Sequence, residues 1–170
     1  YMANGSSGYN NSWEHVHTFD ITDYASILQN DKEIRAHYSG WSSGFSATLE
    51  FIFIEGTPPR DPLKVENIWR VGAGYNSSSD FESNHLPAKD VSIDAAAANS
   101  GMRVYVSGHG FDNSVGCAEF CERTYNLKVD GSIVGENLMW KDDCGLNPIY
   151  PQGGTWIYDR ANWCPGSRVP

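Results

Sequence analysis

The segment Arg123–Trp140, RTYNLKVDGSIVGENLMW, decides the fold class because it reads as two strands joined by a tight turn. Two strand-like runs flank the pair Asp130-Gly131, and an Asp-Gly pair in that position is among the strongest hairpin signals in a sequence. The segment therefore predicts an antiparallel hairpin that turns at Asp130 and Gly131.

Further strand candidates lie upstream of this hairpin. The clearest is FSATLEFIFIEGTPP, which begins at Phe45, alternates apolar and polar residues as a half-buried strand does, and stops at Gly56 and the following prolines. Residues 33–40, 65–75, 91–96 and 102–110 are weaker candidates. We expect an all-β protein with antiparallel sheets, a short turn or helix before Tyr24 capped by Asp20 or Thr22, and a loop at 77–90.

Composition narrows the class of protein. The chain has 170 residues, of which 40% are hydrophobic and 13% aromatic, so one compact domain or two small ones can be built. Charged residues make up only 19%, which is typical of a secreted β-protein rich in turns. The formal charge of −9 disfavours nucleic acid and anionic membranes as partners.

We expect neither a membrane span nor a secretory signal within this sequence. No apolar run is long enough to span a membrane, and residues 1–12 lack the basic and apolar regions of a secretory signal. If the protein is exported, we expect its signal to have been removed or to lie outside this chain.

The four cysteines favour disulfides in an oxidising compartment. Twenty-two residues separate Cys121 from Cys144, and 19 separate Cys144 from Cys164, whereas Cys117 lies close to Cys121. Four cysteines allow three pairings, and the spacing does not choose among them. The alternative is a zinc site, but zinc fits two close pairs, or one pair with nearby histidines, better than this pattern.

The segment Cys117-Ala-Glu-Phe-Cys121 is the first candidate for chemistry. A disulfide between its ends would close so short a ring that it stabilises the fold little and mainly fixes the backbone. Glu119 at the apex would then be held in one orientation, as an active site requires of a carboxylate. The alternative is a loop tied by a disulfide, with Glu119 in solvent.

The segment DRANWCPG, residues 159–166, is the second candidate. An arginine beside a cross-linked turn, here Arg160, can hold a carboxylate through two hydrogen bonds. Trp156 and Trp163 have flat faces that suit sugar rings, although Trp163 would equally pack on a neighbouring disulfide as core tryptophans do.

Three histidines are candidates for a site. His15 and His17 lie two residues apart, so in a strand they would share one face and could be metal ligands, although such pairs are more often exposed without a role. His109 lies in a glycine-flanked turn, where site residues often occur, and could equally be a turn histidine with satisfied ring nitrogens.

Three motifs together resemble the peptide-N-glycosidase F family. They are GCAEFCERT from Gly116, CGLNPI from Cys144 and DRANWCPGSRVP from Asp159, and they match GCAEWCFRT-like, CSANPI-like and DRAGWCPG-like segments in the same order and at nearly the same spacing. Upstream, HTFDITDYASIL and the strand ending at Pro58 resemble the same family more loosely, so that the resemblance runs from about residue 15 to residue 170.

The resemblance implies a fold and an activity. The family folds as two antiparallel jelly-roll sandwiches, and we expect residues 1–60 to be the C-terminal half of the first and 61–170 the N-terminal part of the second, with 58–64 as the linker. The family hydrolyses the amide between the innermost GlcNAc of an N-glycan and asparagine, which becomes aspartate. The expected partner is an N-linked glycoprotein or glycopeptide; no metal or cofactor is expected, and the location is secreted or periplasmic.

The resemblance also implies roles for individual residues. Disulfides would join Cys117 to Cys121 and Cys144 to Cys164. Glu119 matches a glutamate of the active site, and Arg160 an arginine that holds the site's carboxylates, so both are catalytic candidates. The candidates for substrate binding are Trp41, Gly40, His109, Trp163 and Trp156.

Departures from the family pattern are as informative as the matches. The principal catalytic aspartate of the family lies in a segment that precedes the part matched here, so we expect another segment of the same protein to supply it. Gly40 stands where the family has a second glutamate, beside the pocket tryptophan matched by Trp41, and His109 stands where the family has a tryptophan. Loss of the glutamate would open space for a fucose on the innermost GlcNAc.

Two other functions remain open. A carbohydrate-binding module without catalysis is the main alternative, because sandwich folds with aromatic clefts often bind sugars. A copper-dependent monooxygenase is the other, because one such family shares the double jelly roll, but it would require a set of histidine and methionine ligands.

Overall fold

The computed structural model describes residues 12–36, 46–72, 74, 77–110, 117–147, 149 and 152–170. Regular structure in these ranges is sparse and mostly non-helical, and the strands form an antiparallel sheet, in agreement with the predicted class at that level. The elements are η1 (Thr22–Ile27), α1 (Ser78–Asp80), η2 (Phe81–His85), η3 (Ala118–Phe120), β1 (Arg123–Val129), β2 (Ser132–Met139) and η4 (Cys144–Leu146).

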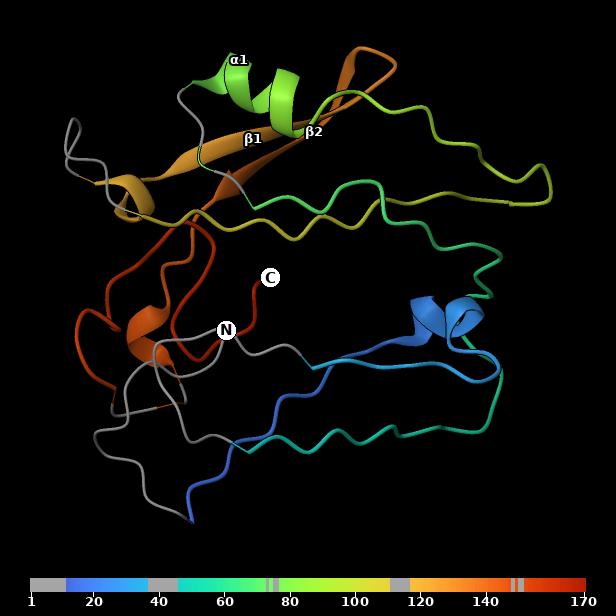
Figure 1. The fold of residues 1–170 in the computed structure, drawn as a ribbon, viewed down its shortest axis with the longest axis horizontal. Coiled ribbons are helices and arrows are strands. Elements are labelled where there is room, and N and C mark those ends of the chain that lie inside the picture. Colours follow the sequence, from blue (N-terminus) through green and yellow to red (C-terminus); the bar gives the residue numbers. More distant parts are fainter. Residues whose placement is uncertain are drawn as a thin grey trace. The chain divides into compact units, whose positions relative to one another are not determined.

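The hairpin predicted from the opening segment is confirmed. β1 and β2 pair antiparallel from Arg123 opposite Met139 down to the turn, and they are the long paired arrows of Figure 1. Asp130 and Gly131 form the turn with φ of +49° and +78°. A turn with two successive residues of positive φ has the same sense of twist as the strands beside it. Asp-Gly pairs favour such a turn because both residues tolerate positive φ.

The other predicted strands form no hydrogen-bonded ladder in the part of the chain that the structure describes. In the 46–54 segment Ile52, Phe53 and Ile54 are 73%, 86% and 90% exposed, so the alternating pattern has not produced a buried face. A strand needs a partner at hydrogen-bonding distance, and alternation of residue types in one segment does not provide that partner.

The chain divides into two compact units, which are described separately. Unit 1 contains residues 1–18, 37–49 and 103–170, and unit 2 contains 19–36 and 50–102. The segment 58–64, which we expected to link two domains, lies inside unit 2 together with the residues on both sides of it, so it does not connect the two units. The expected assignment of 1–60 and 61–170 to two jelly rolls stays a prediction.

Unit 2 contains the short helix expected near Tyr24. The backbone N–H of Thr22 donates a hydrogen bond of 2.9 Å to the carboxylate of Asp20, which supports the first turn of η1. Asp23, inside this helix, pairs with Arg60 at 2.6 Å and connects the helix to the proline-rich segment.

A helical turn replaces the loop predicted at 77–90. The Asp80 backbone N–H donates to the Ser77 hydroxyl at 3.1 Å, which caps the start of α1, and Asn84 donates to the Asp80 carboxylate at 2.7 Å one turn later. The Trp69 indole N–H then donates to the carbonyl of Pro87 at 3.0 Å, so the end of η2 is held against the preceding segment.

Unit 1 carries the buried core of the described residues. The core surrounds the disulfide between Cys144 and Cys164 and is partly polar, with buried side chains that hydrogen-bond to loop carbonyls. Its members are Cys144, Asn147, Ile149, Gln152, Arg160, Ala161, Asn162 and Cys164. No helix among the described residues is long and apolar enough to cross a membrane.

Candidate functional site

Glu119 lies in the middle of a disulfide-closed turn. Cys117 and Cys121 are bonded, with their Cα atoms 5.3 Å apart, and η3 occupies the residues between them. The Phe120 N–H donates to the Cys117 carbonyl at 2.7 Å, and Ala118 adopts a positive φ of +38°. The cross-link therefore holds one compact turn whose backbone direction is set, as the sequence predicted for an aimed carboxylate.

The Glu119 carboxylate is oriented from two sides. The Gly110 N–H donates to its Oε2 at 3.2 Å, and the Nε of Arg160 lies 3.7 Å from its Oε1. The backbone of Glu119 is anchored as well, since its carbonyl accepts from the Ala161 N–H at 2.7 Å. The side chain is 17% exposed, so it is largely enclosed yet reachable.

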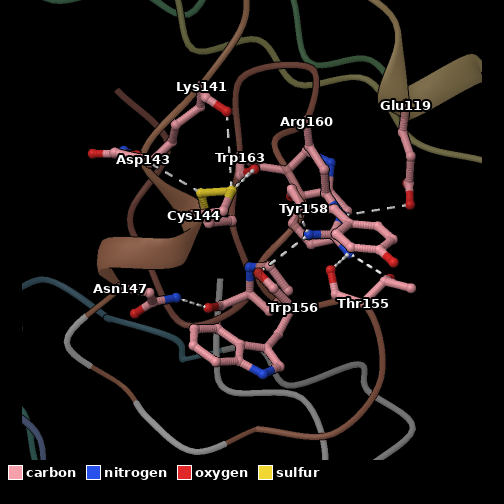
Figure 2. The surroundings of a disulfide bond; sticks show 12 residues. Glu119, Lys141, Asp143, Cys144, Asn147, Thr155, Trp156, Tyr158, Arg160 and Trp163 are labelled. Carbon is pink, nitrogen blue, oxygen red and sulfur yellow. Dashed lines mark hydrogen bonds and ion pairs between the residues drawn. A yellow bond between two sulfur atoms is a disulfide. The ribbon is translucent and has the colours of Figure 1, made fainter.

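Arg160 is buried and held by a ring of acceptors. Its Nη atoms donate to the carbonyls of Thr155 at 2.6 Å and Tyr158 at 2.8 Å, to the Thr155 hydroxyl at 2.8 Å, and more weakly to the Trp156 carbonyl at 3.5 Å. Figure 2 shows the guanidinium between this loop and Glu119. With both Nη atoms occupied, it is the Nε atom that faces the carboxylate of Glu119 and forms an ion pair with it. Among the described residues Nε has no hydrogen-bond partner.

Burial and charge act in opposite directions on Arg160. Burial lowers the pKa of its guanidinium, and the negative charge of Glu119 opposes that shift. An arginine remains protonated under these conditions. The site therefore contains a fixed positive charge beside a carboxylate, in a partly enclosed setting where such charges interact strongly.

Aromatic rings enclose the arginine. The guanidinium carbon lies 5.0 Å from the centre of the Phe120 ring and 4.9 Å from that of Trp163. The Trp163 indole N–H donates to the Gly108 carbonyl at 2.7 Å, which fixes the orientation of the ring. Trp163 therefore packs on charged and polar groups of the site, and its half-buried ring keeps part of its surface accessible.

His109 completes this cluster. Its ring centre is 4.6 Å from that of Trp163, and its Nε2 is hydrogen-bonded to the Ser107 hydroxyl at 3.0 Å. Burial lowers the pKa of His109, Arg160 lowers it further, and Glu119 acts against the shift. The imidazole is therefore mainly neutral at neutral pH and available as a hydrogen-bonding group beside the carboxylate.

The second disulfide helps to hold the segment that carries Arg160. Cys144 and Cys164 are bonded, with Cα atoms 5.3 Å apart, and both are fully buried. Lys141 and Arg160 exchange two backbone hydrogen bonds of 2.8 and 3.1 Å, which pair the segment after β2 with the DRANWCPG segment. The segment from Arg160 to Cys164 is thus held at both of its ends.

The structure brings together four of the predicted site residues: Glu119, Arg160, His109 and Trp163. Trp156 contributes its carbonyl to Arg160, while its indole is directed away from Glu119 in Figure 2. The expected sugar-pocket residues Gly40 and Trp41 lie outside the described residues. The cysteine pairing is the one that the family resemblance implied.

Sequence reasoning missed three residues of the site. Phe120 lies inside the cysteine ring and could have been noticed as an aromatic beside Glu119, and its ring also meets Tyr158 edge-on at 6.2 Å. Thr155 and Tyr158 act mainly through backbone carbonyls, which every residue has, so the sequence holds no signal for their role.

The described residues contain no set of side chains that could bind a metal ion. All four cysteines are in disulfides, which removes them as zinc ligands. No three His, Cys, Asp or Glu side chains converge as metal ligands in the ranges that the structure describes. The arrangement instead offers a held carboxylate, a fixed positive charge and flat aromatic faces, which together suit hydrogen bonding and stacking with a neutral polar ligand such as a sugar.

The chain belongs to the peptide-N-glycosidase F family: the family model described as "Peptide-N-glycosidase F, C terminal" matches residues 74–170. It is 29% identical over 164 residues to the peptide-N(4)-(N-acetyl-beta-D-glucosaminyl)asparagine amidase F of Elizabethkingia miricola. That match covers 89% of this chain and 45% of the relative, so the chain spans slightly less than half of the relative's length. No solved structure matches the chain.

Proposed function

We propose that this chain forms part of a glycoamidase that hydrolyses the amide between the innermost GlcNAc of an N-glycan and asparagine. The observation that carries this proposal is the pair of Glu119 and Arg160, 3.7 Å apart and enclosed by aromatic rings, within the segment matched by the family model. The expected substrate is an N-linked glycoprotein or glycopeptide, and neither metal nor cofactor takes part.

The reaction requires a water molecule, a proton path and a held substrate. The water oxygen bonds to the amide carbon, the carbon–nitrogen bond breaks, and the leaving nitrogen takes a proton, which yields aspartate and a glycosylamine. In this proposal an aspartate on another segment of the same protein acts on the water. Glu119 hydrogen-bonds to the reacting groups, and Arg160 orients Glu119 through its ion pair.

The sugar would bind against the aromatic side of this cluster. Trp163 and His109 offer adjacent rings near Glu119. Trp156, Trp41 and Gly40 stay proposed contacts of the sugar. With glycine in place of a glutamate at position 40, the pocket would admit a fucose on O3 of the innermost GlcNAc. Release that fails whenever this fucose is present, while the unfucosylated glycopeptide is cleaved, would refute the fucose idea.

The proposed setting is an exported protein with two jelly-roll domains, divided at residues 60 and 61. Two disulfides support a secreted or periplasmic location, since such bonds persist in oxidising compartments. The exposed apolar side chains of the 46–54 segment support completion of the first sandwich by further strands of the protein.

The decisive experiment compares Glu119→Gln with Glu122→Gln in the intact protein. The two residues lie three apart, and Glu122 is exposed outside the cysteine ring, so it is the matched control. We expect Glu119→Gln to lower kcat by about 100-fold or more, the range for loss of a preorganised group that hydrogen-bonds to the reacting atoms, and Glu122→Gln to change little. Conversion of asparagine to aspartate in a glycopeptide is followed by mass spectrometry in water enriched in heavy oxygen.

Two results would contradict the proposal. Full activity of Glu119→Gln would remove Glu119 from the reaction. Wild-type protein that binds the glycopeptide and releases no glycan would indicate a carbohydrate-binding protein instead, the alternative that the aromatic cluster also supports.

A further inference from the structure

A pocket lies in unit 1, and neither Glu119 nor Arg160 is among its lining residues. Its volume is about 380 Å³, within the range of small-ligand sites. None of the residues assigned to the glycoamidase site lines it. The lining residues are His15, Val16, His17, Thr18, Lys141, Gly166, Ser167 and Arg168.

The pocket concentrates nitrogen donors and positive charge. His15 and His17 are both half-buried, with their ring centres 4.5 Å apart, whereas Val16 between them is 72% exposed. The Lys141 side chain is 19% exposed, and its Nζ lies 2.7 Å from one carboxylate oxygen of Asp143. Arg168 is exposed, so the described lining residues include two permanent cations, one of which, Lys141, is already paired with Asp143.

Burial and nearby positive charges both act on the pKa of His17. Burial lowers the pKa of His17, and the positive charges of His15 and Arg168 lower it further. Burial is the largest cause of this shift, and only the smaller electrostatic part reflects positive charge nearby, including that of Arg168. That positive charge attracts an anion, in a chain whose formal charge is −9.

One wall of the pocket is rigid. Ser167 donates its backbone N–H to the Cys164 carbonyl at 3.0 Å, beside the buried disulfide. Gly166 is buried with φ of +82°, and a Cβ there would come within 3.1 Å of Ile149, so the turn packs tightly on the core. Arg168 follows directly after this fixed turn, which limits the ordering that binding would require.

We propose that this pocket binds a small oxyanion, a carboxylate, sulfate or phosphate group, through Arg168 and Lys141, with the imidazole N–H groups of His15 and His17 as further donors. Guanidinium and ammonium groups form the strong, charge-assisted hydrogen bonds that such oxygens accept. None of these residues has a role in the proposed glycoamidase reaction, although the backbone of Lys141 is hydrogen-bonded to that of Arg160.

The test titrates the intact protein with sodium sulfate and, separately, sodium acetate, at constant ionic strength made up with chloride, by isothermal calorimetry. Three forms are compared: wild type, Arg168→Gln and the control Arg70→Gln, which makes the same charge change at an exposed residue of unit 2. We expect one site in wild type and Arg70→Gln, and affinity at least about tenfold weaker in Arg168→Gln, as loss of a charge-assisted hydrogen bond predicts.

The two salts identify the kind of oxyanion. Preference for sulfate supports a tetrahedral sulfate or phosphate group, and preference for acetate supports a carboxylate. Equal affinity in all three forms would mean general ionic effects and would overturn the proposal, as would no heat of binding with either salt. Saturable zinc binding that His17→Gln abolishes, with no anion binding, would establish a metal site and also overturn it.

Discussion

Arg160 shows how one residue can organise a site through its hydrogen bonds. Its side chain is 3% exposed, and its Nη atoms are used on loop oxygens, so the guanidinium is fixed before it meets Glu119. A charge so deeply buried is tolerated only because the acceptors and the carboxylate compensate its lost hydration. The residue therefore supports both the fold and the orientation of Glu119.

Replacing Arg160 by methionine tests that double role. We expect a loss of roughly 3 kcal/mol in the free energy of unfolding, since Glu119 and the loop carbonyls lose their partner in a buried setting. Arg123→Met, at an exposed residue of β1, serves as the control and should change stability by less than about 0.5 kcal/mol. Urea unfolding followed by tryptophan fluorescence measures both, and equal stabilities of the two variants would contradict the role assigned to Arg160.

We expect His109 to contribute to the pH dependence of stability. The unfolded imidazole titrates near its ordinary pKa of about 6.5, whereas in the folded protein burial first, and Arg160 next, lower the pKa of His109. At pH values between the two pKa values of His109, the unfolded state therefore binds more protons than the folded state. As the pH falls through this range, the free energy of unfolding decreases, and the decrease ends below the pKa of the folded protein.

The change His109→Gln isolates this contribution. The urea midpoint of wild type should decrease between pH 7.5 and the mildly acidic range, and the decrease should be smaller in the variant. His17, whose pKa is also lowered, continues to titrate in both forms, so the difference between them belongs to His109. An identical pH dependence in the two proteins would show that His109 is not protected from protonation.

At the scale of elements, the hairpin is the part of the fold that local sequence determines. Gly131 at its turn has φ of +78°, and a Cβ there would meet nothing within 4 Å. Gly135 within β2 has ordinary backbone geometry, and a Cβ there would make only van der Waals contacts at 3.7–3.8 Å. The two glycines therefore differ in backbone conformation and not in available space.

We expect Gly131→Ala to destabilise the protein by about 1 kcal/mol, from the strain of a left-handed residue that carries a Cβ. Gly135→Ala should be neutral or slightly stabilising, because a glycine within a strand is entropically costly. Thermal unfolding measured by circular dichroism distinguishes them. If Gly135→Ala proved the more damaging change, the turn assignment would be wrong.

At the scale of the whole molecule, the two disulfides serve different ends. The Cys144–Cys164 bond closes the longer loop and lies fully buried in the core of unit 1, whereas the Cys117–Cys121 bond closes a short turn around Glu119. Loop length sets how much a cross-link restricts the unfolded chain. The first should therefore govern stability and the second the geometry of the site.

Paired serine substitutions separate these roles. Replacing both Cys144 and Cys164 should cost about 3 kcal/mol or more of folding stability. Replacing both Cys117 and Cys121 should cost about 2 kcal/mol or less and should reduce glycopeptide hydrolysis under conditions where the protein remains folded. Calorimetric unfolding and the hydrolysis assay are run on both, and the reverse ranking of stability would refute the assignment.

The sequence by itself determined the features that depend on neighbours along the chain. The Asp130-Gly131 hairpin and the short helix after Asp20 follow from local backbone preferences, whereas the orientation of the Glu119 carboxylate also needs Gly110 and Arg160. The α1 turn was missed because Ser77 and Asp80 look equally like loop residues until the cap forms. The strand prediction for residues 46–54 failed to give a ladder because pairing needs a distant partner, which no local pattern specifies.

Only the tertiary structure decided which distant residues share a site. It placed Arg160 against Glu119, His109 on Trp163, and the histidines at 15 and 17 in one pocket with Lys141 and Arg168. These meetings depend on long-range closure of the chain and on carbonyl groups common to all residues, so no spacing in the sequence encodes them. The surroundings assembled in this way also act on the pKa of His109, which burial lowers and Glu119 opposes.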